Sequence, residues 1–143
     1  MNVGGFPLTD LQAVILNAAW HDTDSTPEAF EIAARLGLRE ALLRARPWLL
    51  EPVMVVVALT PEDFLAEVIG DFNRRGGQVQ GLAKHGSIAA VTATAPFASL
   101  AGYENDLRAM TQRRGACTMA FDRYDQAPPT ADENLPVAAA MRV

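Results

Sequence analysis

The sequence predicts an α+β protein whose larger part, residues 52–127, is a two-layer βαββαβ sandwich. The prediction rests on an order of elements that occurs twice between residues 53 and 127: a strand, a helix, an arginine doublet followed by glycine, and another strand. Two such βαβ halves interleave in the ferredoxin-like fold. Residues 1–51, by contrast, contain one apolar run and one amphipathic run. One strand and one helix do not enclose a core, so this part is predicted to be an incomplete unit.

The composition is that of a folded, water-soluble domain. The chain has 143 residues, of which 50% are hydrophobic and 20% charged, and its formal net charge is −5. No apolar run reaches the length of a membrane-spanning helix, and the N-terminus lacks the basic and apolar segments of a secretory signal. We therefore expect a cytoplasmic protein without a membrane partner. The single cysteine, Cys117, excludes an internal disulfide and a cysteine-rich zinc site.

The first unit is predicted to contain a strand at Leu11–Trp20 and a long helix after it. Leu11–Trp20 is apolar on both faces, which is typical of a central strand covered on both sides. The helix is expected to begin at a capping box, Ser25-Thr26-Pro27-Glu28. Its inward face comprises Phe30, Ala34, Leu38, Ala41 and Leu42. Without further strands, these apolar surfaces should be partly exposed or covered by a second chain.

The second unit is predicted to begin with a strand at Val53–Leu59, which is rich in β-branched residues. Thr60 is the expected N-cap of the helix that follows, and Pro61 its first residue. The inward face of this helix comprises Phe64, Val68, Ile69 and Phe72. Cations at the negative end of the helix dipole, Arg74-Arg75, and then two glycines indicate where it ends.

The second half of this unit repeats the pattern. Gln78–Leu82 and Ile88–Ala95 are the next expected strands, and Pro96 to Ser99 form a turn. A helical stripe follows, made of Leu100, Tyr103, Leu107 and Met110. The helix is expected to end at Arg113-Arg114-Gly115, and the inward face of the last strand comprises Cys117, Met119 and Phe121. Residues 128–143 have no periodicity and are predicted to be a disordered tail.

Two polar features are candidate functional sites. The loop His21-Asp22-Thr23-Asp24-Ser25 places a histidine beside two aspartates and a serine. A metal site there would require further converging ligands, and a hydrolytic site would require a second base and oxyanion donors. A helix-capping loop and a polar loop that contacts another molecule both stay open. The doublets Arg74-Arg75 and Arg113-Arg114 either complement the helix dipoles or contact RNA phosphates.

The order of these elements resembles the C-terminal part of elongation factor G. The resemblance is carried by "GGFPLTDLQAVIL", "WHDTDSTPEAFEIAARLGLREAL", "TPEDFLAEVIGDFNRRGGQVQG" and "AGYENDLRAMTQRRGACTMAFDRYDQAP", which together cover about residues 4–128. It implies that residues 1–51 are the second half of domain IV, a partial unit like the second domain of ribosomal protein S5. It also implies that residues 52–127 are domain V, with the ferredoxin-like fold.

The resemblance implies a role for each candidate site. In this family the histidine loop lies at the tip of domain IV and reaches the decoding centre, where it follows the transfer RNA and messenger during translocation. His21 falls at that histidine, and Asp22, Asp24 and Ser25 occupy the rest of the loop. For domain V the family implies contact with ribosomal RNA, with Arg74, Arg75, Arg113 and Arg114 as the candidates. The expected partners are therefore the ribosome and the missing N-terminal domains of the parent protein.

No catalytic, cofactor-binding or metal-binding residue is predicted. The sequence has no GxxxxGK[ST] phosphate loop, so GTP is expected only in a full-length parent and the chain alone is not expected to be an enzyme. One departure from the family is "TQRRG" at residues 111–115, where the usual pattern is TQGRA. Two alternatives stay open: a fragment of a ribosomal protection protein, and a stand-alone ferredoxin-like interaction module that dimerises through the unpartnered strand Leu11–Trp20.

Overall fold

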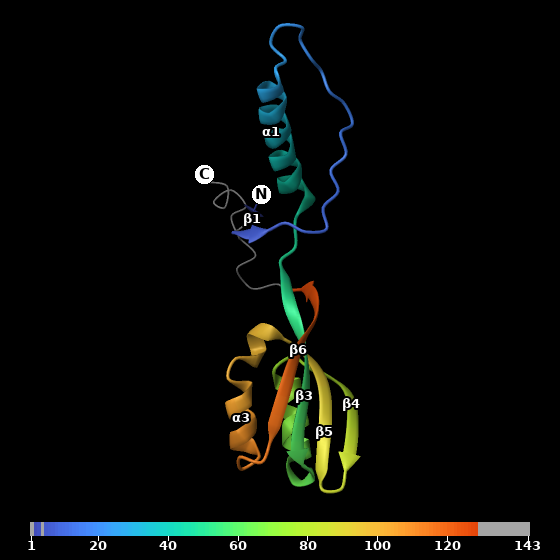
Figure 1. Cartoon of the computed structure of the whole chain (residues 1–143), viewed down its shortest axis with the longest axis vertical. Helices are drawn as coiled ribbons and strands as arrows, with labels where there is room; N and C mark the ends of the chain where they lie inside the picture. The colour runs from blue at the N-terminus through green and yellow to red at the C-terminus, as the bar shows by residue number, and fades with distance from the viewer. Residues whose placement is uncertain (1, 4, 129–143) are drawn as a thin grey trace. The chain divides into compact units, whose positions relative to one another are not determined.

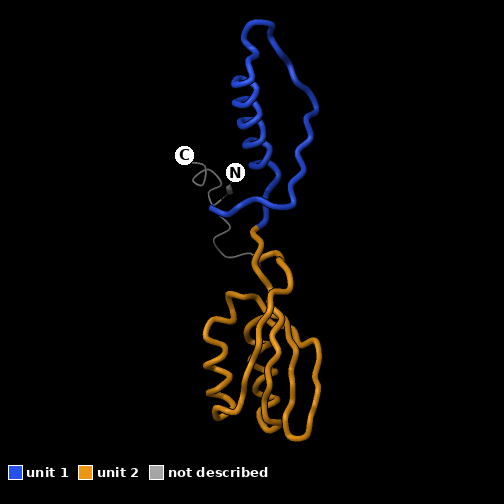
Figure 2. The backbone as a smooth tube through the Cα atoms, in the orientation of Figure 1, with its two compact units in different colours: residues 1–48, 128–143 blue, residues 49–127 orange. Residues whose placement is uncertain are grey.

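The computed structural model describes residues 2–3 and 5–128. The chain divides into unit 1, residues 1–48 together with 128–143, and unit 2, residues 49–127 (Figures 1 and 2). Apart from Pro128, the predicted tail lies outside the described residues. Unit 2 begins before the predicted boundary at residue 51, because Leu50 and Glu51 already pair with the last strand. None of the described helices is long and apolar enough to cross a membrane.

Unit 2 has the predicted βαββαβ order, and its four strands form one antiparallel sheet with the order β4-β5-β3-β6 (Figure 1). The fold is therefore the ferredoxin-like sandwich that the repeated pattern predicts. Its elements are β3 (Leu50–Pro61), the short 3₁₀ helix η1 (Glu62–Phe64), α2 (Leu65–Arg74), β4 (Gln78–His85), β5 (Ile88–Pro96), η2 (Phe97–Leu100), α3 (Tyr103–Met110) and β6 (Ala116–Gln126).

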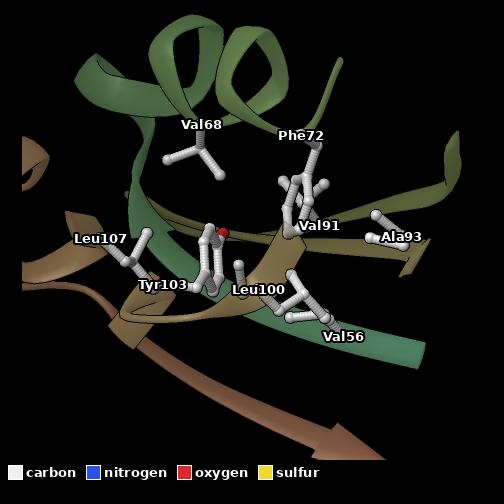
Figure 3. Close-up of a cluster of buried hydrophobic side chains, with 10 residues drawn as sticks. Val56, Val68, Phe72, Val91, Ala93, Leu100, Tyr103 and Leu107 are labelled. Carbon is white, nitrogen blue, oxygen red and sulfur yellow. The ribbon is translucent and has the colours of Figure 1, made fainter. Parts of the chain in front are cut away.

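The core of unit 2 lies between the two helices and one face of the sheet. Val68 and Phe72 of α2 and Tyr103 and Leu107 of α3 are completely buried (Figure 3). They pack against small and β-branched side chains of the central strands, among them Val56, Ala58, Val91 and Ala93. The rings of Phe72 and Tyr103 lie 5.0 Å apart between centroids. Each large apolar side chain buried in this way contributes about 1.5–3 kcal/mol relative to exposure.

The predicted helix start at Thr60 is wrong. Thr60 and Pro61 are instead the last residues of β3, where they pair with Ala89 and Ile88 of β5. Thr60 is completely buried and its hydroxyl donates to the carbonyl oxygen of Pro61, at 3.1 Å, rather than accepting from a helix N–H. The pairing of β3 with β5 continues through Thr60 and Pro61, so the strand extends past the residues that have the pattern of a helix cap. The helix α2 begins only after η1.

The predicted inward face of β6 is only partly buried. Cys117 is half-buried, whereas Met119 is 38% exposed and Phe121 is 55% exposed. All three lie on the helix side, because they pair with Ala58, Val56 and Met54 on that side of β3. The reason is length: α3 has 8 residues and β6 has 11, so a helix of about 12 Å faces a strand of about 36 Å. Most of the helix side of β6 therefore lies beyond the reach of α3.

Unit 1 contains the predicted helix but not the predicted strand. The helix α1 runs from Pro27 to Ala45, and a small ladder joins β1 (Asn2–Val3) to β2 (Phe6–Pro7). Leu11–Trp20 pairs with no strand among the described residues, so that prediction is wrong for this chain. The residue types suit a buried strand, but a strand requires hydrogen-bonding partners that the described part of unit 1 does not supply.

The expected exposure of apolar side chains in unit 1 is confirmed. Ile15 and Leu16 are 84% and 94% exposed, Phe30 of α1 is half-exposed, and Leu42 is the one fully buried hydrophobic residue among those described in this unit. Two ion pairs lie along α1, with 2.6 Å between Oε1 of Glu31 and Nη2 of Arg35 and 2.5 Å between Oε1 of Glu40 and Nη2 of Arg44. Pairs of this kind contribute only about 0.3–0.5 kcal/mol each, so they do not replace a core.

The two units should therefore respond differently to truncation of a leucine. Leu107→Ala removes a completely buried side chain and should lower the free energy of unfolding of unit 2 by about 2–5 kcal/mol. The matched control Leu16→Ala should change it by less than about 0.5 kcal/mol, as for other exposed positions. Urea unfolding followed by far-ultraviolet circular dichroism measures both. Both tryptophans, Trp20 and Trp48, lie in unit 1, so their fluorescence should not follow the cooperative unfolding of unit 2. Equal losses of stability in Leu107→Ala and Leu16→Ala would contradict the assignment of the core.

Candidate nucleic-acid interface

The histidine loop of unit 1 is a compact turn closed by its own hydrogen bonds. The backbone N–H of Ser25 donates to the carbonyl oxygen of His21 at 3.1 Å, and the N–H of His21 donates to Oγ of Ser25 at 2.6 Å. The N–H of Thr26 donates to the carbonyl oxygen of Asp24 at 3.1 Å. Because these contacts join residues four or fewer positions apart, the shape of the loop depends on local chemistry and not on tertiary packing.

The imidazole of His21 is exposed, and its Nδ1 atom faces two other loop residues. Nδ1 lies 3.0 Å from the hydroxyl oxygen of Thr23 and 3.6 Å from Oδ2 of Asp24. The side chains of His21 and Asp24 are 71% and 84% exposed. The structure thus brings together His21, Asp24 and Ser25 of the predicted site and adds Thr23, which sequence reasoning missed. The sequence pattern that indicates a role for Thr23 is a hydroxyl residue two positions after a histidine in a turn.

The helix after the loop is capped one residue later than predicted. Thr26, not Ser25, is the N-cap: its Oγ1 accepts from the N–H of Ala29 at 3.2 Å. Ser25 is occupied in closing the loop. A backbone hydrogen bond and a hydrogen bond with the Thr26 side chain lower the pKa of Glu28 in the first turn. Among the described residues no group of three or more His, Cys, Asp or Glu side chains is arranged to hold a metal ion.

In unit 2, the guanidinium group of Arg75 joins α2 to the segment around α3. Nε donates to Oδ2 of Asp71 at 2.7 Å, Nη1 to the carbonyl oxygen of Ser99 at 2.8 Å, and Nη2 to Oδ2 of Asp106 at 2.6 Å. The group also lies 5.1 Å from the ring centre of Tyr103. Burial lowers the pKa of Arg75, but the hydrogen bonds to the two carboxylates outweigh it and the net direction is upward.

Arg75 is therefore a structural residue, and its neighbour Arg74 is the exposed member of the doublet. The side chain of Arg75 is 16% exposed, whereas that of Arg74 is 73% exposed and lies 3.2 Å from Oδ1 of Asp71. Because all three guanidinium nitrogens of Arg75 donate inside unit 2, Arg74 is the member of the doublet that is better placed to contact RNA. Gly76 then adopts a left-handed φ of +72°, which ends the helix as the sequence predicts.

The second doublet lies in a strained loop after α3. The helix ends at Met110, earlier than predicted, and the hydroxyl group of Thr111 accepts from the N–H of Gly115 and donates to the carbonyl oxygen of Leu107, both at 2.7 Å. Between Thr111 and Gly115, the residues Gln112 and Arg113 both have left-handed backbones, with φ of +54° and +66°. Arg113 and Arg114 are exposed, and the guanidinium carbon of Arg114 lies 5.4 Å from the ring centre of Phe64.

The structure does not bring the two doublets together. Arg75 follows the end of α2 and contacts Tyr103, the first residue of α3. Arg114 follows the end of α3 and contacts Phe64, directly before α2. Each helix therefore ends beside the start of the other, and the doublets lie at opposite ends of the helical layer. Any RNA that contacts both would have to span this layer.

Both units match one protein family. Residues 2–46 match the family described as elongation factor G, domain IV, and residues 48–135 match the one described as elongation factor G C-terminus. The chain belongs to the elongation factor G family. It is 46% identical over 126 residues to elongation factor G of Rhodopseudomonas palustris and of Hyphomonas neptunium, an alignment that covers 88% of this chain and 18% of each relative. The chain thus spans less than a fifth of these relatives' length.

A solved structure agrees with this membership. A crystal structure of a Thermus thermophilus protein matches the chain with a TM-score of 0.78 and 31% sequence identity, over 96% of this chain and 21% of that one. Within the elongation factor G pattern, the usual TQGRA places glycine where this chain has Arg113. The left-handed φ of +66° at this position explains the usual glycine, and it shows that this chain carries an arginine at some conformational cost.

The two arginines of the first doublet should differ sharply in their effect on stability. Arg75→Ala leaves Asp71 buried without its closest cation and should lower the free energy of unfolding of unit 2 by about 2–4 kcal/mol. Arg74→Ala removes an exposed ion pair and should lower it by less than about 1 kcal/mol. Chemical denaturation of the two variants under identical conditions provides the comparison. Similar losses for both would show that Arg75 is not the joint between the helices.

Arg113→Gly should stabilise unit 2 while removing a candidate RNA contact. Glycine relieves the left-handed strain, and the net gain after its own entropic cost is about 0.5–1 kcal/mol. Arg114→Gly is the matched control, because Arg114 has an ordinary φ and loses its contact with Phe64; it should destabilise. Thermal unfolding measures both changes. A destabilised Arg113→Gly variant would mean that the Arg113 side chain contributes more to stability than its backbone costs.

Proposed function

We propose that this chain is the ribosome-contacting part of an elongation factor G-type protein and acts in translocation without catalysis of its own. The observation that carries the proposal is the match of both units to consecutive parts of one family. In this proposal, the histidine loop contacts transfer RNA and messenger at the decoding centre, and unit 2 contacts ribosomal RNA. Binding and hydrolysis of GTP would belong to the parent protein, and the location would be the cytoplasm.

The properties of the loop support contact with RNA in a confined space. His21, Asp22 and Asp24 are exposed, and the loop is held by its own hydrogen bonds. A histidine ring can stack on an unpaired base or donate to a phosphate or ribose oxygen. The carboxylates of Asp22 and Asp24 repel phosphates that approach the loop anywhere but at the imidazole. This repulsion favours one defined contact over a general attraction of the loop to the RNA backbone.

In unit 2, the proposed contacts come from helix ends and loops. The exposed arginines Arg74, Arg113 and Arg114 supply the cations. The sheet face that points away from the helices is built differently, because side chains alternate along each strand. Six residues along its centre are small or β-branched, namely Val55, Val57, Ala90, Thr92, Thr118 and Ala120. The aromatic side chains that stack RNA bases on other sheets of this fold are not among them.

A second candidate function is self-association through unit 1. Its support is the exposed, unpaired segment Leu11–Trp20, in which Val14, Ile15 and Leu16 are all exposed. Two copies of such a segment can pair as neighbouring strands and bury apolar side chains. No observation favours a ribosomal protection protein over an elongation factor G. Sedimentation velocity over a concentration series separates the two candidates, because self-association raises the mass with concentration and ribosome contact does not require it.

Co-sedimentation with 70S ribosomes across a salt series tests the ribosome proposal. The variant Arg74→Ala/Arg113→Ala/Arg114→Ala should bind more weakly and should lower the slope of log affinity against log salt by about two, as fewer phosphates are neutralised. The matched control removes three cations that are paired with carboxylates of unit 2, Lys84, Arg108 and Arg123. It should bind more like the unchanged chain. Equal losses in both variants would indicate general charge attraction, and no binding at low salt would reject the proposal.

A further inference from the structure

We propose that Thr23 fixes the neutral imidazole of His21 with its proton on Nε2, so that the exposed ring offers an N–H donor to an oxygen acceptor of RNA. This inference rests on the proposed function, and it assigns a positioning role to a residue outside the predicted site. Thr23 would act through His21 and not by contacting RNA. The observation behind it is that two polar groups of Thr23 approach the same ring nitrogen.

The backbone N–H of Thr23 indicates which ring nitrogen accepts. It is directed at Nδ1 of His21 at 3.5 Å, and a backbone N–H can only donate. This contact favours Nδ1 as the acceptor, and therefore as the ring nitrogen that carries no proton. In a neutral imidazole the proton then resides on Nε2, since the hydrogen bond at one ring nitrogen sets the state of the other.

The hydroxyl group of Thr23 makes the shorter contact and acts in the same direction. It lies 3.0 Å from Nδ1, which is within the usual range for a hydrogen bond. Although a hydroxyl can donate or accept, donation to Nδ1 agrees with the backbone contact and acceptance does not. The lone pair on Nδ1 of His21 thus faces two donors of Thr23, the backbone N–H and the hydroxyl group. Of these two, a substitution of Thr23 can remove the hydroxyl group.

Asp24 favours the opposite tautomer but is placed too far away to impose it. Its Oδ2 atom lies 3.6 Å from Nδ1, beyond a normal hydrogen bond. Both side chains are mostly exposed, so solvent screens the attraction. A proton on Nδ1 would also point at the N–H of Thr23. The three contacts around Nδ1 therefore favour Nε2–H in the neutral ring.

A fixed donor has a clear use at the tip of a loop. Phosphate oxygens and ribose hydroxyl oxygens accept hydrogen bonds, and in the Nε2–H form the outer edge of the ring is a donor without a formal positive charge. Such a donor recognises an oxygen by geometry, while Asp22 and Asp24 disfavour the general approach of phosphate. Because the ring is already held in place, less conformational entropy is lost on binding.

Nitrogen-15 NMR of the full chain above neutral pH tests the inference directly. Long-range ¹H–¹⁵N spectra distinguish a protonated from an unprotonated ring nitrogen, and His85 at the end of β4 serves as the internal reference. We expect Nδ1 of His21 to be unprotonated. In Thr23→Val, which keeps the shape and removes the hydroxyl, the excess of Nε2–H over Nδ1–H should fall about five-fold, as for the loss of one hydrogen bond. Thr23→Ser should retain it.

Ribosome binding of the same variants separates this inference from the proposed function. If His21→Ala weakens co-sedimentation, Thr23→Val should weaken it in proportion to the lost tautomer and Thr23→Ser should not. An unchanged tautomer ratio in Thr23→Val overturns the inference even where His21→Ala weakens binding. A shifted ratio with no effect of His21→Ala on binding overturns the proposed contact of the loop with RNA, and the donor role with it, while the effect of Thr23 on the ring is retained.

Discussion

The pairing of β3 with two strands at once is the interaction on which the rest of the structure depends. From Val53 to Leu59, every residue of β3 pairs with β5 on one side and with β6 on the other. This satisfies the backbone hydrogen bonds of the central strand and leaves Val56 and Ala58 pointing at the helices, where they are completely buried. The helices can then pack on one face only, and their ends determine where each arginine doublet emerges.

The two doublets show how one sequence pattern acquires two roles. In the first, Asp71 is one turn before Arg75, and Asp106 of α3 lies within reach, so Arg75 becomes the joint between the helices. In the second, no carboxylate takes this part for Arg113 or Arg114 among the described contacts, and Arg114 packs over Phe64 instead. The difference depends on which residues the other helix places beside each doublet. This tertiary arrangement cannot be read from the repeated sequence pattern.

The same distinction separates what could be predicted from the sequence from what could not. Periodicity identified α1, α2, α3 and all four strands of unit 2, because each is encoded by neighbours along the chain. Thr60 was placed wrongly because its environment is set by pairing with Ala89, a residue far along the chain. Leu11–Trp20 has the residue types of a strand, but a strand also requires partners. In the loop, His21 and Ser25 were found by residue type, whereas the contact of Thr23 with Nδ1 depends on the fold of the turn.

The contrast between the two units bears on how a partner would act. Among the described residues, the apolar segment Leu11–Trp20 of unit 1 is exposed. A partner that buries this segment, whether a second copy or further strands of a parent protein, would stabilise unit 1 by preferential binding. The histidine loop does not share this dependence. Its hydrogen bonds connect residues within one turn, from His21 to Thr26, and they require no burial. The shape of the loop is thus encoded locally, whereas burial of the apolar segment would depend on a partner. A loop of this kind can keep its histidine in place whether or not the apolar segment of the same unit is buried.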